Sequence, residues 1–209
     1  MKRLFSVYGD SISTFEGVTP DGWSIFYTGE QREATGVQTP ADTWWMQVIR
    51  TLGGAYLSNI SISGNTICTE GKMGGFPPRR LHQLTAEGKT PDHILLYAGL
   101  NDVMFYIPPA VFQAEYLQLL TNLKQIYPKA QVHCGTLILG EIPGTVNSLQ
   151  GIIQRAEPYN AIIRQAVAET DCHLVDLAAL RGRYHALDAF HPNRDGMAQL
   201  AQLWLRAMK

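Results

Sequence analysis

The fold of this chain is decided near its start, by the stretch Leu4-Phe5-Ser6-Val7-Tyr8-Gly9-Asp10-Ser11-Ile12. The apolar run at its beginning predicts a short buried strand, and Gly9 and Asp10 predict a tight turn. A serine on such a turn, after the first strand, is where an open α/β sheet presents a nucleophile. Since Gly-Asp-Ser is also common as a plain turn, its meaning depends on what later segments bring to it.

Four further apolar segments predict strands, and helical patterns lie between them. The five predicted strands are residues 4–8, 55–62, 93–98, 132–138 and 173–177. The predicted helices are residues 43–52, 78–86, 109–126, 152–169 and 195–208. We expect Asp42 to cap the first of these helices and Pro158 to kink or divide the fourth. The alternation predicts an α/β fold with a five-stranded parallel sheet, covered by helices on both faces in three layers.

The chain is expected to form one domain over residues 1–209, because no repeat, low-complexity tract or linker interrupts it. Residues 13–41 form a long insertion after the first strand, and connections longer than about 12–15 residues are uncommon and often functional. The insertion follows Ser11 directly and carries the aromatic residues Phe15, Trp23, Phe26 and Tyr27. We expect this insertion to form a lid over the substrate site or one of its walls. The alternative is an ordered surface insertion whose aromatic rings pack only against the sheet edge.

The composition of the chain excludes several classes of protein. The net charge of −1 argues against a nucleic-acid-binding protein, and no apolar run approaches the length of about 18 residues that spans a bilayer. The chain enters its first strand at once and leaves no room for a signal peptide, so we expect a cytoplasmic protein. Three widely spaced cysteines, Cys68, Cys134 and Cys172, indicate thiols in a reducing compartment. Nothing in the composition specifies an oligomeric state.

Two Cys-His pairs raise the question of a metal site. His133-Cys134 and Cys172-His173 each lie in a predicted strand, and the two strands could be neighbours. Adjacent strand residues point to opposite faces, so each pair offers one ligand to a face. We therefore favour ordinary strand residues over zinc ligands.

A serine becomes a nucleophile when a base lies within hydrogen-bond reach and a third group orients that base. Asp188 and His191, three residues apart before the last helix, can fold so that the carboxylate meets the imidazole. Asp171 and Asp176 are other possible partners, but the local Asp188 is the simpler one. The ordinary alternative is a surface histidine with a chance acidic neighbour.

Donors for a developing oxyanion are expected at two other strand ends. Gly64 follows the second predicted strand, and Asn101 follows the third. Because the carboxyl ends of parallel strands lie along one edge, Ser11, Gly64 and Asn101 should converge there. The ordinary alternatives are a turn glycine and an asparagine that caps the next segment.

Taken in order, these blocks resemble those of the SGNH family, also called the GDSL esterases and lipases. The first block is Gly9-Asp10-Ser11-Ile12, with Ile12 where many members carry Leu, and Gly64 fits the glycine of the second. Gly99-Leu100-Asn101-Asp102 matches Gly-x-Asn-Asp of the third block, and Asp188-Ala189-Phe190-His191 matches Asp-x-x-His of the last. The blocks span nearly the whole chain, and the family's flavodoxin-like α/β/α fold agrees with the predicted layers.

The resemblance implies a role for each of these residues. Ser11 would be the nucleophile, His191 the general base and acid, and Asp188 the group that orients His191. The backbone N–H groups of Ser11 and Gly64 and the side chain of Asn101 would form the oxyanion hole. The implied activity is ester hydrolysis through an acyl-enzyme, which requires no metal or organic cofactor.

The substrate is expected to be an ester with a small or medium acyl group. One class is acetyl removal from a sugar or glycan, where aromatic rings could stack on the sugar. The other is a lysophospholipase or thioesterase with a longer acyl pocket. The absence of a long, wholly apolar loop favours short acyl groups.

Several side chains are candidates for substrate binding. They are Asp10, Trp23, Phe105 and Tyr106, while Trp44 and Trp45 are either further stacking rings or core residues. A sugar- or nucleotide-binding protein on the same fold is the non-enzymatic alternative. The intact set of Ser11, Asn101, Asp188 and His191 argues against it.

Overall fold

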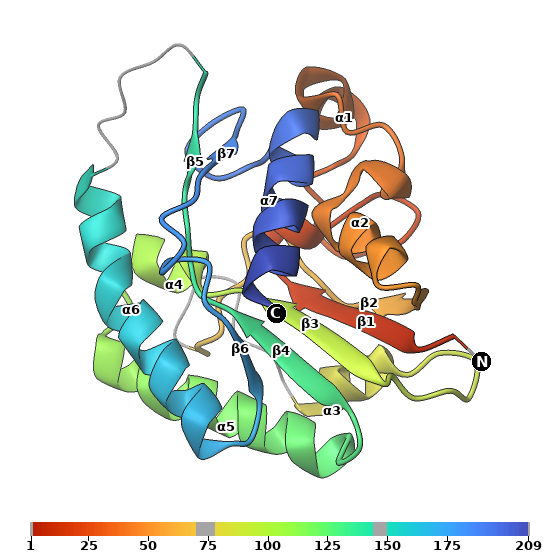
Figure 1. The fold of residues 1–209 in the computed structure, drawn as a ribbon, viewed down its shortest axis with the longest axis vertical. Helices are drawn as coiled ribbons and strands as arrows, with labels where there is room; N and C mark the ends of the chain where they lie inside the picture. Colours follow the sequence, from red (N-terminus) through yellow and green to blue (C-terminus); the bar gives the residue numbers. More distant parts are fainter. Residues whose placement is uncertain (1, 70–77, 144–149, 209) are drawn as a thin grey trace.

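A five-stranded parallel sheet forms the middle layer of the protein in the computed structural model, which describes residues 2–69, 78–143 and 150–208 (Figure 1). The strands are β1 (Leu4–Gly9), β2 (Ala55–Asn59), β3 (His93–Tyr97), β4 (Gln131–Gly135) and β6 (His173–Val175). Their order across the sheet is β2-β1-β3-β4-β6, and each neighbouring pair is parallel. The predicted three-layer α/β fold with five parallel strands is confirmed.

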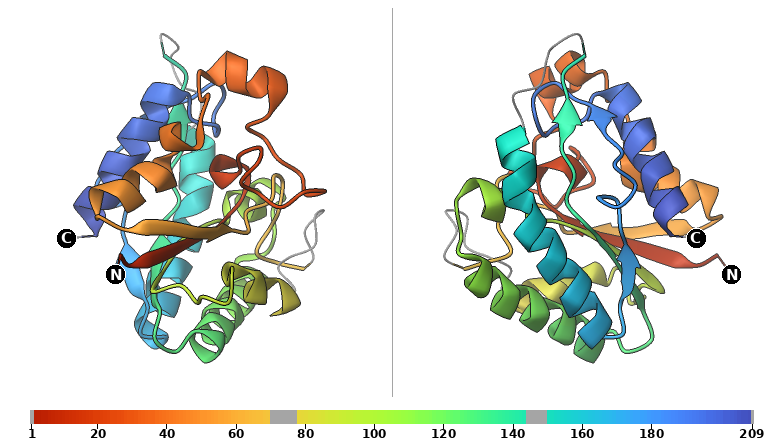
Figure 2. Two further views of the ribbon diagram at one scale, coloured as in Figure 1. Left: turned by 90° about the vertical axis from the view of Figure 1, so that its right-hand side faces the viewer. Right: turned by 60° about the vertical axis from the view of Figure 1, so that its left-hand side comes forward.

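Helices cover both faces of this sheet, as the two views of Figure 2 show. On one face, α2 (Trp44–Thr51) packs against α7 (Arg194–Ala207). On the other face, α6 (Gln150–Glu169) packs against α5 (Pro109–Ile126), with α3 (Pro78–Leu81) beside α5. The prediction for residues 109–126 matches α5 at both ends, because Pro109 favours a helix start and Pro128 prevents continuation.

Several short elements lie outside the predicted set. They are α1 (Gly29–Thr35), α4 (Leu100–Met104), two 3₁₀ turns, η1 (Ser11–Ser13) and η2 (Pro40–Asp42), and a small parallel sheet of β5 (Gly140–Glu141) and β7 (Tyr184–His185). Most of them lie at or near the carboxyl edge of the main sheet, where the loops are. Elements of two to seven residues carry too little periodicity to be recognised from sequence. The helix predicted over residues 78–86 is present as α3 followed by a 3₁₀ turn, η3 (His82–Leu84).

One expectation about a helix end was wrong. Thr43, and not Asp42, is the N-cap of α2, and its side chain accepts the N–H of Met46. The Asp42 carboxylate instead accepts the N–H of Thr39 at 2.8 Å and so closes the preceding 3₁₀ turn. Of the two outcomes expected at Pro158, division of the helix does not occur: α6 continues past Pro158, and packing against α5 stabilises it despite one missing backbone donor.

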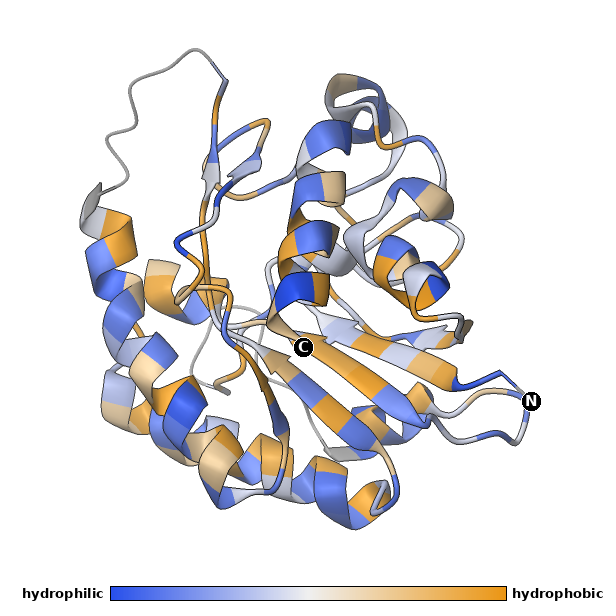
Figure 3. Cartoon of the chain, viewed as in Figure 1, coloured by the Kyte–Doolittle hydropathy of each residue, from blue (hydrophilic) through white to orange (hydrophobic). Residues whose placement is uncertain are grey.

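The core lies between the layers, with apolar residues along the central strands and polar residues on the outer faces of the helices (Figure 3). Trp44 of α2 stacks on Trp204 of α7 with ring centroids 4.6 Å apart, and Tyr97 of β3 meets both rings edge-on. No disulfide joins Cys68, Cys134 and Cys172, all three of which lie in the described part of the chain. Within the described residues, no helix is both long and apolar enough to cross a membrane.

Candidate active site

Ser11 lies on a turn that the preceding two residues shape. The Oδ1 atom of Asp10 accepts the N–H of Ile12 at 3.0 Å and so caps the 3₁₀ turn that Ser11 begins. A Cβ on Gly9 would lie 2.6 Å from Ser13 Oγ and 2.9 Å from the Tyr97 carbonyl oxygen, so a side chain at residue 9 would push this turn off β3. The turn therefore leaves the end of β1 at one fixed angle.

Buried side chains also form hydrogen bonds to the turn that carries Ser11. The carbonyl oxygen of Ser13 accepts hydrogen bonds from Asn59 Nδ2 at 2.8 Å and Trp45 Nε1 at 3.0 Å. Trp44 Nε1 donates to Ser13 Oγ at 3.2 Å. Both tryptophans are fully buried, so they belong to the core and cannot stack on a sugar.

His191 bridges Ser11 and Asp188. Its Nε2 lies 2.9 Å from Ser11 Oγ, and its Nδ1 lies 2.7 Å from Asp188 Oδ2. The other carboxylate oxygen, Oδ1, accepts the backbone N–H groups of Phe190 at 2.7 Å and His191 at 2.8 Å. The structure thus joins residues 180 positions apart into one chain of hydrogen bonds.

The electrostatics of Asp188 follow from these contacts. Partial burial alone would raise the pKa of Asp188, but the hydrogen bonds from His191 and Phe190 outweigh it and hold the pKa below its ordinary value. Asp188 is therefore a carboxylate at neutral pH, facing Nδ1 of His191. Asp176, the alternative partner, is paired with Arg164 at 2.8 Å, and exposed Asp171 lies near Lys124.

Asn101 and Gly64 lie on neighbouring segments of the same sheet edge. Asn101 is in the first turn of α4, and its Nδ2 donates to the Asn65 carbonyl oxygen at 2.7 Å. Gly64 has φ +78° in the turn after β2, which a residue with a side chain rarely adopts. The buried Asp102 carboxylate accepts the N–H groups of Ile67 and Cys68, and so ties the loop after Gly64 to α4.

A small pocket of about 130 Å³ opens beside Ser11. Ser11, Asn101 and His191 line it together with Asp10, Ile12, Leu100, Met104, Phe105 and Phe190. Gly64 lies in the turn that contacts Asn101 through Asn65 and is not among these lining residues. The pocket adjoins β1 and β3, where the order of the strands reverses and open α/β sheets bind their ligands.

The expected substrate-binding residues divide into two groups. Asp10 and Phe105 line the pocket, as expected for residues that meet a substrate. Trp23 and Tyr106 do not: Trp23 packs under the guanidinium of Arg80 at 4.3 Å, and Tyr106 packs under that of Arg155 at 4.5 Å. Their rings are therefore engaged by arginines of this chain.

The insertion after Ser11 contacts one face of the His191 ring. The Phe26 ring stacks on the His191 ring with centroids 3.5 Å apart and an interplanar angle of 6°. The next residue, Tyr27, is fully buried and donates its hydroxyl to the Pro192 carbonyl oxygen at 2.9 Å. The sequence shows the aromatic residues of this insertion but not which of them contacts the histidine.

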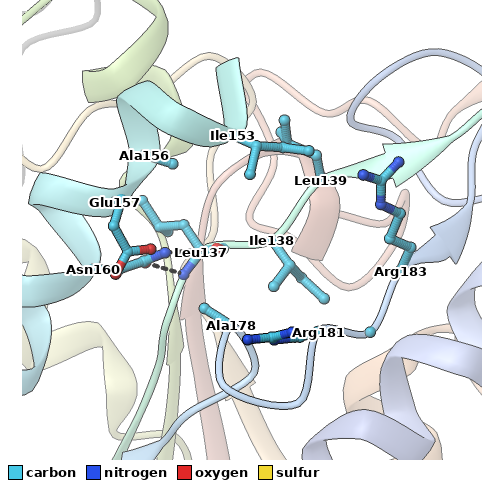
Figure 4. Close-up of a pocket in the computed structure, with 11 residues that line it drawn as sticks. Leu137, Ile138, Leu139, Ile153, Ala156, Glu157, Asn160, Ala178, Arg181 and Arg183 are labelled. Carbon is cyan, nitrogen blue, oxygen red and sulfur yellow. Dashed lines mark hydrogen bonds between the residues drawn. The ribbon is translucent and has the colours of Figure 1, made fainter. Parts of the chain in front are cut away.

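A second cavity, of about 210 Å³, lies between the segment that follows β4, the helix α6 and residues 178–183 (Figure 4). Leu137, Ile138 and Ile153 line its apolar part, and Arg181 and Arg183 lie at its edge. Its lining includes none of Ser11, Asp188 and His191. In the part of the chain that the structure describes, no group of three or more His, Cys, Asp or Glu residues could hold a metal ion.

The raised pKa of the buried Asp10 carboxyl should make the stability of the protein depend on pH. Burial raises the pKa of Asp10 from 3.8 to about 6, although the Ile12 N–H and His191 favour its charged form. Between these two pH values the folded protein keeps a proton that the unfolded chain releases, so this group makes stability fall as pH rises. The loss is on the order of 2–3 kcal/mol.

The measurement is urea unfolding of the wild type and Asp10→Asn at pH 4 and pH 7. An asparagine oxygen can still accept the Ile12 N–H, while the charge is removed. We expect Asp10→Asn to gain stability relative to the wild type on going to pH 7. A stability difference that stays the same at both pH values would show that Asp10 is not perturbed in this way.

The fold is that of a flavodoxin-like α/β/α protein, and its candidate site lies at the carboxyl ends of β1 and β3, beside the loop that carries His191. The sequence matches the GDSL-like Lipase/Acylhydrolase family over residues 7–199, and the chain belongs to that family. It is a GDSL-like hydrolase, as the resemblance of its four blocks suggested. No curated protein sequence matches the chain.

Solved structures share the same fold. A putative GDSL-like lipase from Bacteroides ovatus is similar with a TM-score of 0.74 and 23% identity, covering 100% of this chain and 98% of that chain. One from Bacteroides uniformis has a TM-score of 0.72 and 24% identity, covering 98% and 94%. A carbohydrate esterase family 2 enzyme from Corynascus thermopiles has a TM-score of 0.66 and 18% identity, covering 100% and 66%.

Proposed function

We propose that this protein is a serine esterase that hydrolyses a small or medium acyl ester through an acyl-enzyme. One observation carries the proposal: His191 is hydrogen-bonded to Ser11 Oγ at 2.9 Å and to Asp188 at 2.7 Å. These distances lie within the range required of a nucleophile, its base and the group that orients the base. The family and the pocket beside Ser11 support the same activity.

In the first half of the reaction, Ser11 Oγ attacks the ester carbonyl carbon while His191 Nε2 accepts the serine proton. Asp188, holding Nδ1–H, stabilises the imidazolium that forms. When the tetrahedral intermediate collapses, the bond to the alcohol breaks and His191 returns the proton to the leaving oxygen. Ser11 is left acylated.

In the second half, His191 takes a proton from water, and the resulting hydroxide attacks the acyl carbon. The bond to Ser11 Oγ breaks, and His191 gives the proton back to that oxygen. The products are a carboxylic acid and the regenerated enzyme. No metal or organic cofactor enters any of these steps.

The developing oxyanion needs donors on the pocket side of Ser11. We assign this role to the backbone N–H groups of Ser11 and Gly64 and to Asn101. An amide side chain has two N–H bonds, and the bond from Asn101 Nδ2 to the Asn65 carbonyl oxygen uses one of them. That bond fixes the plane of the amide, so the second N–H is oriented before the substrate arrives.

Asn101→Ala is expected to lower kcat on a short aryl ester by about 10²- to 10³-fold, because one oxyanion donor contributes about 3 kcal/mol. KM should change little, since the donor acts mainly on the transition state. Asn122→Ala in α5, whose side chain pairs with Gln118, is the matched control. A loss in kcat no larger than that of the control would remove Asn101 from the oxyanion hole.

The size and chemistry of the pocket favour short acyl groups. A volume of about 130 Å³, with apolar side chains from Ile12, Leu100, Met104, Phe105 and Phe190, suits an acetyl or similarly short chain. An O-acetylated carbohydrate is the preferred substrate class within this proposal.

Two other functions remain to be separated from this one by experiment. A lysophospholipase or thioesterase would need a longer acyl pocket, and a sugar- or nucleotide-binding protein would use the same sheet edge without chemistry. The test is hydrolysis of aryl esters of increasing chain length, followed by acetylated sugars and lysolipids.

We expect acetate and butyrate esters to be cleaved at least about tenfold faster than octanoate, because longer chains exceed the pocket. Faster cleavage of octanoate would favour the lipid-type enzyme. Failure to cleave any of the esters would favour a binding protein.

A further inference from the structure

The insertion after Ser11 covers one face of the histidine that the proposed reaction uses. Phe26 lies flat on His191, with ring centroids 3.5 Å apart and planes within 6° of parallel. The histidine side chain is 16% exposed. We infer that Phe26 is a positioning residue, which holds the imidazole in the plane where Nε2 meets Ser11. This inference rests on the proposed esterase function.

The backbone of Phe26 is tied to the turn that carries Ser11. The Oγ1 atom of Thr14 accepts the Phe26 N–H at 2.9 Å and donates its own hydrogen to the Ser11 carbonyl oxygen at 2.9 Å. One buried hydroxyl therefore joins the insertion to the nucleophile turn. Through this link, the position of the Phe26 ring is set relative to Ser11.

The neighbouring residue is tied to the other partner of the reaction. Tyr27 donates its hydroxyl to the Pro192 carbonyl oxygen at 2.9 Å, one residue after His191. Its ring meets Phe26 edge-on, with centroids 5.0 Å apart and an interplanar angle of 78°. The Phe26–Tyr27 pair thus bridges the Ser11 turn and the His191 loop.

The hydrogen bonds of His191 restrain tilting of its imidazole ring only weakly. Asp188 holds Nδ1 and Ser11 meets Nε2, but both contacts lie near the ring plane and resist tilting of the ring poorly. A parallel aromatic ring on one face opposes that tilt and keeps water off the same face. Misplacement of a catalytic group by 1 Å can cost about 10²-fold in rate, so a contact that acts only on orientation can matter.

The test compares kcat and KM on a short aryl ester for the wild type, Phe26→Ala, Phe26→Leu and Phe26→Tyr. We expect Phe26→Ala to lower kcat by about 10- to 100-fold with little change in KM. Phe26→Tyr keeps the planar ring and should restore the wild-type kcat, whereas Phe26→Leu fills the space without a ring and should not. Glu33→Ala, exposed on α1 of the same insertion, is the matched control.

A second readout does not depend on activity. Stacking should shift the NMR signals of the His191 ring protons upfield in the wild type and in Phe26→Tyr, and this shift should be absent in Phe26→Leu. Thermal unfolding identifies any variant that fails to fold. If Phe26→Ala is such a variant, the comparison of Phe26→Leu with Phe26→Tyr supplies the result.

The two possible failures are distinguishable. If the wild type hydrolyses the ester in a Ser11-dependent way, but folded Phe26→Ala or Phe26→Leu keeps the wild-type kcat, the inference is overturned and the proposed function stands. If the wild type shows no Ser11-dependent hydrolysis, the proposed function is overturned and the inference fails with it.

Discussion

Replacing His191 with alanine is expected to lower kcat on a short acyl ester by about 10⁴- to 10⁶-fold. His191 Nε2 is the one ring nitrogen 2.9 Å from Ser11 Oγ, so its loss removes the acceptor for the serine proton and the donor for the leaving alcohol. Both chemical steps of the proposed reaction lose their proton carrier. Steady-state hydrolysis of an aryl acetate measures the effect.

A control separates this result from a general effect of losing a histidine. His82 is exposed in the 3₁₀ turn after α3, and His82→Ala should leave kcat at the wild-type level. Thermal unfolding should show that His191→Ala remains folded. Retention of more than about one hundredth of the wild-type kcat in His191→Ala would mean that another group serves as the base.

Asp188→Asn is expected to lower kcat by about 10⁴-fold while leaving the loop intact. The carbonyl oxygen of asparagine can still accept the N–H groups of Phe190 and His191 that Asp188 Oδ1 accepts now. Its NH₂ group would then face His191 Nδ1, which must become an acceptor. The ring proton moves to Nε2, and that nitrogen can no longer take the proton of Ser11.

Asp195→Asn, exposed in the first turn of α7, is the matched control for this substitution. It removes the same charge from the same part of the chain without touching His191, and it should keep the wild-type kcat. If Asp188→Asn behaves like the control, Asp188 does not orient the histidine, and the reaction would need a different account.

The main elements of the fold could be predicted because their signals are local and long enough. The buried strands read as apolar runs, and each predicted strand lies within a few residues of β1, β2, β3, β4 or β6. The long helix α5 begins at Pro109 and ends at Ile126, two residues before Pro128. Alternation of the two kinds of element then leaves few arrangements besides a parallel sheet with helices on both faces.

The contact between Asp188 and His191 could be anticipated from their spacing, but that Ser11 meets His191 could be anticipated only through the family motif. Chain distance alone does not reveal that residues 11 and 191 meet. The topology is consistent with this contact. Ser11 follows β1, which lies beside β3 in the middle of the sheet. The His191 loop leads into α7, and α7 packs against α2 on one face of the same sheet.

What the sequence did not reveal depends on contacts between distant segments. The stacking of Phe26 on His191 and the double role of Thr14 Oγ1 follow from how residues 13–41 fold back onto the site. The engagement of Trp23 and Tyr106 by arginines is of the same kind. The small β5–β7 sheet is set by pairing between segments more than forty residues apart, and each strand is too short for its own pattern.

The central claim is that Ser11 is a nucleophile activated by His191, and covalent labelling tests it most directly. The protein is incubated with a fluorophosphonate probe, and the intact mass and the modified peptide are measured by mass spectrometry. We predict one added phosphonyl group, located on Ser11, which is lost in Ser11→Ala and strongly slowed in His191→Ala. Absence of labelling in the wild type, together with a Ser11→Ala variant that cleaves aryl acetate as the wild type does, would contradict the account.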